Sequence, residues 1–335
     1  MQKMDCLHFR TRLLKSLQTA TGPRRDELYV LSTAIWTEEV KGRELFASYY
    51  AMEKFFEPSA FGKNSNGSYH RNKWSKYAVG LSRPSRKLVE QVENVFPKTK
   101  QIIEHPLWEI LRAGTTKGKN IALWIDRLLP EMKSIYYWNG HYLSPYSKYK
   151  NQSSVQLQMA ERRAGIDSLA LISIFLFEAI KNDGRKMFIH RAISSLYTVL
   201  LITCLESPYR EFSDELFDCF NRRIFMQAHP KGYRLGLDLI EVEEVIRLLL
   251  FELRRMDARE EIRADRNSII RVFLKLLGGR YGYDLRYALN PPYVSAADNL
   301  DHETRKFIEH SRKSWEWGLQ VLREGRIERI PPHDL

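Results

Sequence analysis

The residues with the clearest chemical capacity are basic side chains in the stretch from residue 63 to residue 87. Seven lysines and arginines fall there, and no Asp or Glu occurs between Glu57 and Glu90. Tyr69, Trp74 and Tyr77 lie among them and supply rings for packing or stacking. Each cation brought against a phosphate backbone releases condensed counterions, which favours binding. The pattern predicts a polyanion-binding surface formed by Lys63, Arg71, Lys73, Lys76, Arg83, Arg86 and Lys87.

The net charge is also distributed unevenly along the chain. Residues 1–150 hold 25 Lys and Arg against 14 Asp and Glu, whereas residues 151–335 hold 28 against 27. Nearly all of the net charge of +12 therefore belongs to the first region. Such asymmetry predicts a polyanion-binding end and a second part with another role. The alternative is a basic surface that serves solubility alone.

Length and composition limit the class of protein. A chain of 335 residues with 44% hydrophobic residues is long enough for two folded domains, which we predict at 1–150 and 151–335. Its three cysteines lack CxxC spacing, so we predict no disulfide framework, metal site or cofactor. The N-terminus has no long apolar stretch of the signal-peptide type, and no apolar run reaches the roughly 20 residues that span a bilayer. We expect a cytoplasmic protein without a membrane partner.

The elements that must position the basic residues are helices. Periodicity predicts one helix over 43–56, an exposed loop over 62–67, and a second helix over 70–79 that stops at Gly80. Pro84 and Ser85 then open a third helix over 86–96. Trp74 and Tyr77 are three residues apart, which places them on one helical face suited to a core.

A different pattern covers residues 135–143. Asn139-Gly140 between aromatic flanks predicts a small β-hairpin. This ribbon is typical either of a wing or stacking platform for nucleic acid or of an aromatic cover over a core. The polar stretch 144–156 is the predicted domain boundary, and a helical bundle is expected after it. The helices predicted in that bundle cover residues 158–164, 167–181, 185–205, 214–225, 235–256, 263–277 and 302–323, with a connector from Gly278 through Pro292.

The segment from Trp74 to Leu88 reads Trp-Ser-Lys-Tyr, then Gly80, Pro84-Ser85 and Leu88. It resembles the second half of a lambda-repressor-like, or Cro/cI-type, helix-turn-helix. In that family a recognition helix enters the major groove of DNA, a glycine closes it, and Pro-Ser starts the next helix. The resemblance covers about residues 70–96, within a core of about 43–96. It implies a dimeric DNA-binding protein from a bacterial, phage, mobile-element or defence setting.

The resemblance also assigns roles to residues. It makes Asn72, Lys73, Ser75 and Lys76 the base-reading candidates, and Arg71, Arg83, Arg86 and Lys87 the phosphate contacts. Lys63 extends the phosphate-contacting set into the preceding loop. One departure is that Pro58–Tyr69 stands where the family has a short turn. The alternative interpretation is an ordinary helix pair with basic residues on its surface.

A second motif suggests an enzyme. Arg185 and His190 have the Arg-x4-His spacing of HEPN-type ribonucleases, which are similar in being helical. That resemblance implies a metal-independent ribonuclease in which this pair activates a ribose 2′-hydroxyl and holds the scissile phosphate. A solvated or capping pair explains the same spacing without catalysis.

Together these patterns predict a mainly α-helical protein. Its basic N-terminal region contains a divergent helix-turn-helix and a small β-hairpin, and a helical domain follows for dimerisation, partner binding or effector function. The favoured function is binding of double-stranded DNA. The alternatives are the HEPN-like ribonuclease acting on RNA and a non-catalytic nucleic-acid-binding subunit of a larger nucleoprotein complex.

Overall fold

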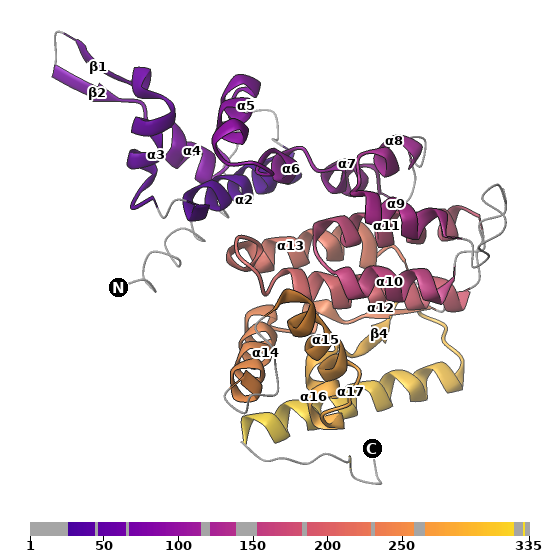
Figure 1. Ribbon diagram of the computed structural model, residues 1–335. Helices are drawn as coiled ribbons and strands as arrows, with labels where there is room; N and C mark the ends of the chain where they lie inside the picture. Colours follow the sequence, from indigo (N-terminus) through magenta and orange to yellow (C-terminus); the bar gives the residue numbers. More distant parts are fainter. Residues whose placement is uncertain are drawn as a thin grey trace. The chain divides into compact units, whose positions relative to one another are not determined.

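The protein is mainly helical, as predicted (Figure 1). The computed structural model describes residues 26–43, 46–64, 67–114, 121–138, 153–182, 186–228, 232–257, 265–324 and 331. Within them the strands form two antiparallel two-stranded sheets, β1–β2 and β3–β4. The chain divides into two compact units. Unit 1 comprises Met1–Glu109 and Glu206–Leu216, and unit 2 comprises Ile110–Leu205 and Phe217–Leu335.

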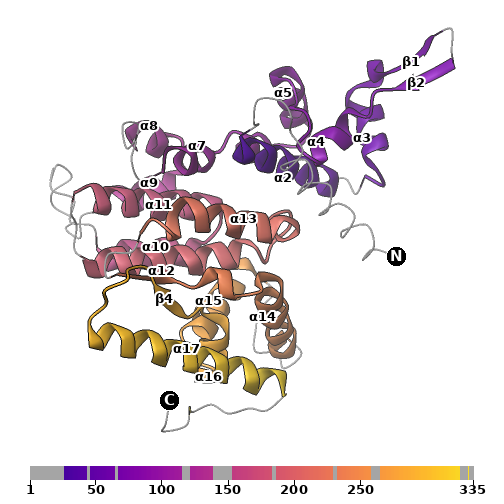
Figure 2. The same cartoon turned by 180° about the vertical axis from the view of Figure 1, so that it is seen from behind.

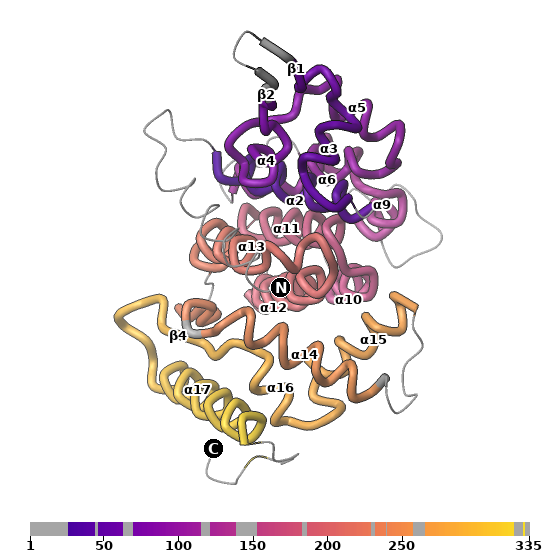
Figure 3. Tube along the Cα trace, turned by 90° about the vertical axis from the view of Figure 1, so that its left-hand side faces the viewer, coloured from indigo at the N-terminus to yellow at the C-terminus, as the bar shows by residue number. Residues whose placement is uncertain are grey.

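Unit 1 consists of short helices and one hairpin. Its elements are α2 (Glu27–Arg43), α3 (Tyr49–Phe56), the 3-10 turn η1 (Pro58–Ala60), β1 (Phe61–Asn64), β2 (Gly67–His70), α4 (Lys73–Ala78), α5 (Arg86–Val95), α6 (Lys100–Ile103), the start of α7 (Pro106–Ala113) and η4 (Tyr209–Phe212). The hairpin extends beyond the helices of this unit (Figure 1), and Figure 3 shows α2, α3 and α4 of the unit packed beside one another. The register pairs Phe61 with His70 and Asn64 with Gly67.

An aromatic stack forms the centre of unit 1. Trp74 of α4 lies between Trp36 of α2 and Phe56 of α3, with ring centroids 5.5 and 5.3 Å away and nearly parallel planes. Both tryptophans are fully buried. Buried aromatic rings contribute a large apolar area together with directional contacts. The stack therefore joins three helices that are separated in the sequence.

Gly80 ends α4 in a conformation that few other residues tolerate. Its φ is +66°, and a Cβ at this position would lie 2.2 Å from Cγ1 of Val30 on α2. Glycine is required here both by the left-handed backbone and by the close approach of the two segments. The predicted helix stop at Gly80 is confirmed, and so is the next helix start, where Ser85 Oγ accepts from the Leu88 amide at 3.2 Å.

Unit 2 is a larger helical assembly. Its elements are α8 (Ile121–Asp126), α9 (Pro130–Tyr137), α10 (Ser154–Arg163), α11 (Ile166–Lys181), α12 (Lys186–Thr203), the remainder of α13 (Ser213–Phe220), the π-helical turn η5 (Asn221–Phe225), β3 (Tyr233–Leu235), η6 (Leu237–Leu239), α14 (Val242–Asp257), α15 (Arg266–Leu277), α16 (Tyr283–Leu289), β4 (Tyr293–Ser295) and α17 (His302–Arg323). Figure 2 shows α17 running along one edge of this unit, over α16.

The core of unit 2 forms around α11 and α12. The residues of α11 from Ser168 to Phe177 are all buried, which explains its nearly continuous apolar sequence. A buried polar cluster ties α12 to α10: Arg191 Nη2 donates to both oxygens of Glu161 at 2.8 and 2.9 Å, and Ser195 Oγ donates to Oε1 at 2.6 Å. At the other side of the unit Gly318 of α17 meets the backbone of α16 closely.

The predicted hairpin at 135–143 is wrong over its first strand. Residues 135–137 belong to α9, because Met132, Ile135 and Tyr136 lie on one buried helical face. Gln156 of α10 completes the end of this helix: its side-chain amide donates to the carbonyls of Ile135, Tyr136 and Trp138 at 3.0–3.3 Å. This contact from a distant segment satisfies backbone acceptors that a helix end otherwise leaves open. The predicted second strand lies outside the described residues.

Other differences concern connectors and boundaries. The stretch over 62–67 is not a simple loop, because it holds most of β1 and the start of β2. The connector after Gly278 contains helix α16, whose Leu285, Ala288 and Leu289 are buried. The predicted boundary over 144–156 lies largely outside the described residues, and the division at residue 150 stays a prediction. Along the chain, the first division between the compact units falls between Glu109 and Ile110.

Candidate nucleic-acid interface

The inner face of α4 is fixed by its aromatic residues, as the sequence predicts. Trp74 is fully buried, and Tyr77 lies beside it with ring centroids 5.9 Å apart. Burial raises the pKa of the Tyr77 hydroxyl above its ordinary value, and the nearby carboxylates of Glu57 and Glu53 add to this effect. Trp74, Tyr77 and Ala78 are the buried residues of the helix, and Ser75 and Lys76 are its exposed ones.

The start of α4 is held by a carboxylate from another helix. Asn72 precedes the helix in a left-handed conformation with φ of 52°, and its side chain makes no capping bond. Instead, Oε2 of Glu53 on α3 accepts from the backbone amide of Trp74 at 3.4 Å and lies 3.1 Å from Nε2 of His70. The side chain of Glu53 is only 1% exposed. A buried acceptor that satisfies a free helix amide sets where the helix begins.

A second carboxylate engages one of the predicted base-reading residues. Lys73 Nζ lies 2.5 Å from Oε1 of Glu57, and both side chains are partly buried. Glu53 lies in α3 and Glu57 directly follows its last residue, so one segment supplies both contacts to the beginning of α4. Lys73 is therefore committed to an intramolecular ion pair in this structure, and of the four base-reading candidates it is the least available.

The other three base-reading candidates are exposed. Asn72, Ser75 and Lys76 all present their side chains to solvent, and Arg71 does so immediately before the helix. Among the described residues, neither Arg71 nor Lys76 has an ion-pair partner. This outer face therefore combines two unneutralised cations with two small polar side chains, a composition suited to phosphates and base edges.

The predicted phosphate contacts near α5 differ in their availability. Lys87 is exposed and, within the described part of the chain, has no ion-pair partner. Arg86 is exposed but pairs with Glu90 one turn along, with Nε 3.0 Å from Oε1. The Arg83 guanidinium lies over the ring of Tyr29, 4.4 Å from its centroid. A cation held on an aromatic face keeps its charge and its outer hydrogen-bond donors.

The hairpin β1–β2 occupies the position where the resembled family has a short turn. Its base is braced by aromatic contacts: the rings of Phe61 and His70 stack at 4.7 Å, and the Tyr50 ring meets each of them at about 5 Å. Lys63 lies in β1, and its backbone pairs with Ser68. The side chain of Lys63 falls outside the described part of the structure. The hairpin leads directly into α4, so its orientation is coupled to that helix.

The second predicted site is not brought together within the described residues. Arg185 falls outside them. His190 lies on α12 within an aromatic cluster, with its ring 5.8 Å from Tyr233 and 5.4 Å from Tyr293, and its Nε2 atom is buried. A ring enclosed in this way suits packing better than contact with an RNA backbone.

Sequence reasoning missed the residues of α3 that support the interface. Glu53 and Glu57 are the last carboxylates before the stretch without acids, and their four-residue spacing places them on one helical face. That spacing is the signal that would have found them. The contact of Arg83 with Tyr29 joins segments more than fifty residues apart and has no local signal.

Comparison with known proteins provides no basis for assigning a function to this chain. No protein-family model, curated protein or solved structure matches the chain. In the described ranges, no group of three or more His, Cys, Asp or Glu side chains is placed to hold a metal ion. The described helices include none with both the length and the apolar character needed to cross a bilayer.

Proposed function

We propose that unit 1 binds double-stranded DNA through the outer face of α4 and the beginning of α5. One observation carries the proposal: exposed, unpaired cations occupy a surface from which the nearby carboxylates have been withdrawn. Arg71, Lys76 and Lys87 are the cations, and Glu53 and Glu57 are the carboxylates, turned inward to hold α4. Within the described residues these three cations have no ion-pair partner, while the neighbouring Arg86 is paired with Glu90, and unpaired cations favour a phosphate backbone.

Duplex DNA is the polyanion that fits this geometry best. The major groove admits an α-helix and displays a different donor and acceptor pattern for each base pair. Asn72, Ser75 and Lys76 supply the exposed donors and acceptors on α4. In this proposal Arg71, Arg83, Arg86, Lys87 and Lys63 contact phosphates and set the orientation of the helix. Unit 2 would then serve dimerisation, partner binding or effector function.

The test is a fluorescence-anisotropy titration of the full chain against duplex DNA, single-stranded DNA and RNA over a range of potassium chloride concentrations. The key variant is Lys76→Glu/Lys87→Glu. Each lost phosphate contact lowers the salt slope by about 0.9, so the variant should reduce the slope by about 2 and the duplex affinity on the order of 100-fold. Circular dichroism verifies that its helices remain folded.

A matched control separates local contacts from net charge. Lys275→Glu/Lys306→Glu makes the same charge change on exposed residues of α15 and α17 in unit 2. This control should keep both the slope and the affinity within about threefold of the unaltered protein. Equal losses in the two variants would contradict the assignment to α4 and α5. Preference for RNA, or its cleavage during the titration, would contradict the choice of duplex DNA and direct attention to His190.

A further inference from the structure

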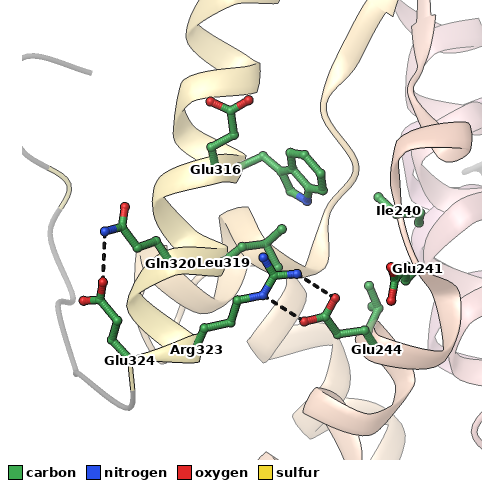
Figure 4. A pocket seen from close by; sticks show the side chains of 10 residues that line it. Ile240, Glu241, Glu244, Glu316, Leu319, Gln320, Arg323 and Glu324 are labelled. Carbon is green, nitrogen blue, oxygen red and sulfur yellow. Dashed lines mark hydrogen bonds and ion pairs between the residues drawn. The ribbon is translucent and has the colours of Figure 1, made fainter.

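A second recognition surface lies in unit 2, in a groove between α14 and α17 (Figure 4). The groove has a volume of about 460 Å³. This lies in the range of ligand pockets, about 300–1,000 Å³. One wall comes from the first residues of α14 and the two residues before it, and the other from the C-terminal part of α17. None of its residues belongs to the proposed DNA-binding surface.

The floor of the groove is apolar. Ile240, Val245, Trp315 and Leu319 line it, and Val245 and Leu319 are buried. The indole nitrogen of Trp315 is buried and, within the described part of the chain, has no hydrogen-bond partner. The indole nitrogens of Trp36 and Trp74 in the core of unit 1 share this state, so the feature that a ligand meets here is the apolar lining.

The rim of the groove is acidic. Four glutamates and one arginine line it, which leaves a net negative charge. Among the described residues Glu241 makes no close ion pair, although it interacts electrostatically with Arg323, and Glu316 pairs with Arg312, one turn away and outside the groove. This surface therefore has the opposite sign to that of unit 1, and it repels a phosphate backbone. The rim consists of Glu241, Glu244, Glu316, Glu324 and Arg323.

One arginine of the chain already binds a glutamate in the groove, and the dashed lines of Figure 4 mark the contact. Arg323 donates from Nε and Nη2 to the two oxygens of Glu244 at 3.1 and 3.0 Å. Bidentate pairing of this kind is the geometry by which carboxylates select arginine over lysine. Glu244 is thereby satisfied, while Glu241 and Glu316 remain on the rim to engage a further cation.

We propose that this groove docks a segment of a partner protein that presents an arginine beside an apolar side chain. The apolar side chain would occupy the floor over Trp315 and Leu319, and the arginine would reach Glu241, with Glu316 adding to the negative charge of the rim. Charge complementarity decides this occupant, because a cation gains from the rim whereas an acidic or nucleic-acid partner is repelled. The inference is independent of DNA binding by unit 1.

The experiment uses the full chain labelled with 5-fluorotryptophan and followed by ¹⁹F NMR. The Trp315 resonance is assigned by its absence in a Trp315→Phe sample. The probes are three acetylated, amidated hexapeptides of sequence Ala-Leu-X-Ala-Leu-X, where X is arginine, citrulline or glutamate. We expect a saturable shift of the Trp315 resonance with the arginine peptide at millimolar concentrations or below. The citrulline peptide, equal in shape but uncharged, should bind at least about fivefold more weakly, and the glutamate peptide should not bind.

Two further measurements decide the outcome. Glu241→Gln/Glu316→Gln should weaken the arginine peptide by about fivefold or more without changing the DNA affinity of unit 1. Equal binding of the arginine and citrulline peptides, or no saturable shift, would overturn the proposal. Sedimentation velocity tests for a second copy in the groove: self-association that this double variant abolishes would also overturn it, because the occupant would then be the chain itself.

Discussion

Two pairs of glutamates, one in each unit, differ in what they contact. The side chains of Glu53 on α3 and of Glu57, which directly follows that helix, are 1% and 16% exposed, and both contact the start of α4. On α14 the side chains of Glu243 and Glu244 are 64% and 22% exposed, and they face solvent and the groove to α17. The same residue type therefore supports the interior in one unit and charges the surface in the other.

The comparison shows how residue placement sets the sign of a surface. Unit 1 withdraws two carboxylates from the neighbourhood of Arg71, Lys76 and Lys87, so the cations remain unneutralised. Unit 2 leaves carboxylates at an open groove with an apolar floor. A net charge counted along the sequence shows the positive charge of unit 1 but not which of its cations remain unpaired. It does not show the acidic groove of unit 2, because α14 and α17 are separated by more than forty residues.

The largest expected effect is at Gly80, which anchors the end of α4. Gly80→Ala places a Cβ 2.2 Å from Val30 Cγ1 and forces a left-handed alanine. Backbone strain and overpacking together should destabilise unit 1 by about 4 kcal/mol. Denaturant unfolding followed by tryptophan fluorescence measures the change.

Gly42→Ala is the control: no atom lies within 4 Å of its added Cβ, and alanine near the end of α2 should stabilise the protein slightly. An unchanged midpoint for Gly80→Ala would contradict the close approach of the two segments.

The next effect tests the inward carboxylates of α3 directly. Glu53→Ala removes the acceptor for the Trp74 amide and the partner of His70, and leaves a cavity. We expect a loss of about 3 kcal/mol in unfolding free energy and weaker duplex binding, because α4 loses its fixed start. Glu53→Gln retains an acceptor and should recover part of the unfolding free energy and part of the duplex affinity.

The control Glu90→Ala alters a carboxylate with 47% of its side chain exposed and should change stability by less than about 0.5 kcal/mol. Equal losses of stability in Glu53→Ala and Glu90→Ala would contradict the special role of the buried carboxylate.

A smaller effect is expected at the buried polar cluster of unit 2. Arg191→Met leaves the carboxylate of Glu161, whose side chain is 9% exposed, with Ser195 as its remaining hydrogen-bond donor. Because the Arg191 side chain is 42% exposed, solvent screens part of the loss, and we expect about 2 kcal/mol. Arg247→Met breaks an exposed pair with Glu243 and should cost less than about 0.5 kcal/mol. Thermal denaturation of both variants measures the contrast, and a larger loss for Arg247→Met would contradict it.

The smallest effect concerns acid stability at the start of α17, one wall of the acidic groove. Hydrogen bonds from the Thr304 amide and hydroxyl lower the pKa of Asp301 below its ordinary value of 3.8. This contribution to stability is complete above that ordinary value and is lost as the pH falls through the lowered pKa of the folded protein. Asp301→Asn keeps a capping oxygen without the charge, so its melting temperature should lie slightly below that of the unaltered protein at pH 7. The two should converge near pH 2. A constant difference across this range would show that the charge of Asp301 makes no contribution.

Local sequence patterns predicted the framework of the interface. Gly80 as a helix stop, Ser85 as the cap of α5, and Trp74 with Tyr77 as the inner face of α4 all follow from residues a few positions apart. The exposure of Ser75 and Lys76 follows from the same periodicity, whereas Arg71 lies before α4 begins. These features depend on local backbone geometry and helical spacing, which a sequence carries directly.

The failures have a common physical origin. The Asn139-Gly140 signal predicted a strand over residues 135–137, yet Gln156 completes a helix there through three carbonyls. The base-reading role of Lys73 stays a prediction, and its ion pair with Glu57, from a segment before the β1–β2 hairpin, was not predicted. In each case the contact comes from another segment, and no pattern within the local segment reports such a partner.

The sequence alone determined the mainly helical class, the concentration of positive charge in the first 150 residues, and the start and stop of the helices around Gly80 and Ser85. Periodicity, glycine and proline chemistry, and charge counts are properties of the chain itself. Only the tertiary structure decided which charges remain available. It turned Glu53 and Glu57 inward beneath α4, and it brought Glu241 and Glu316 to one groove from helices far apart in sequence. The physical reason is that the energy of a charge depends on its burial and partners, and packing between distant segments sets both.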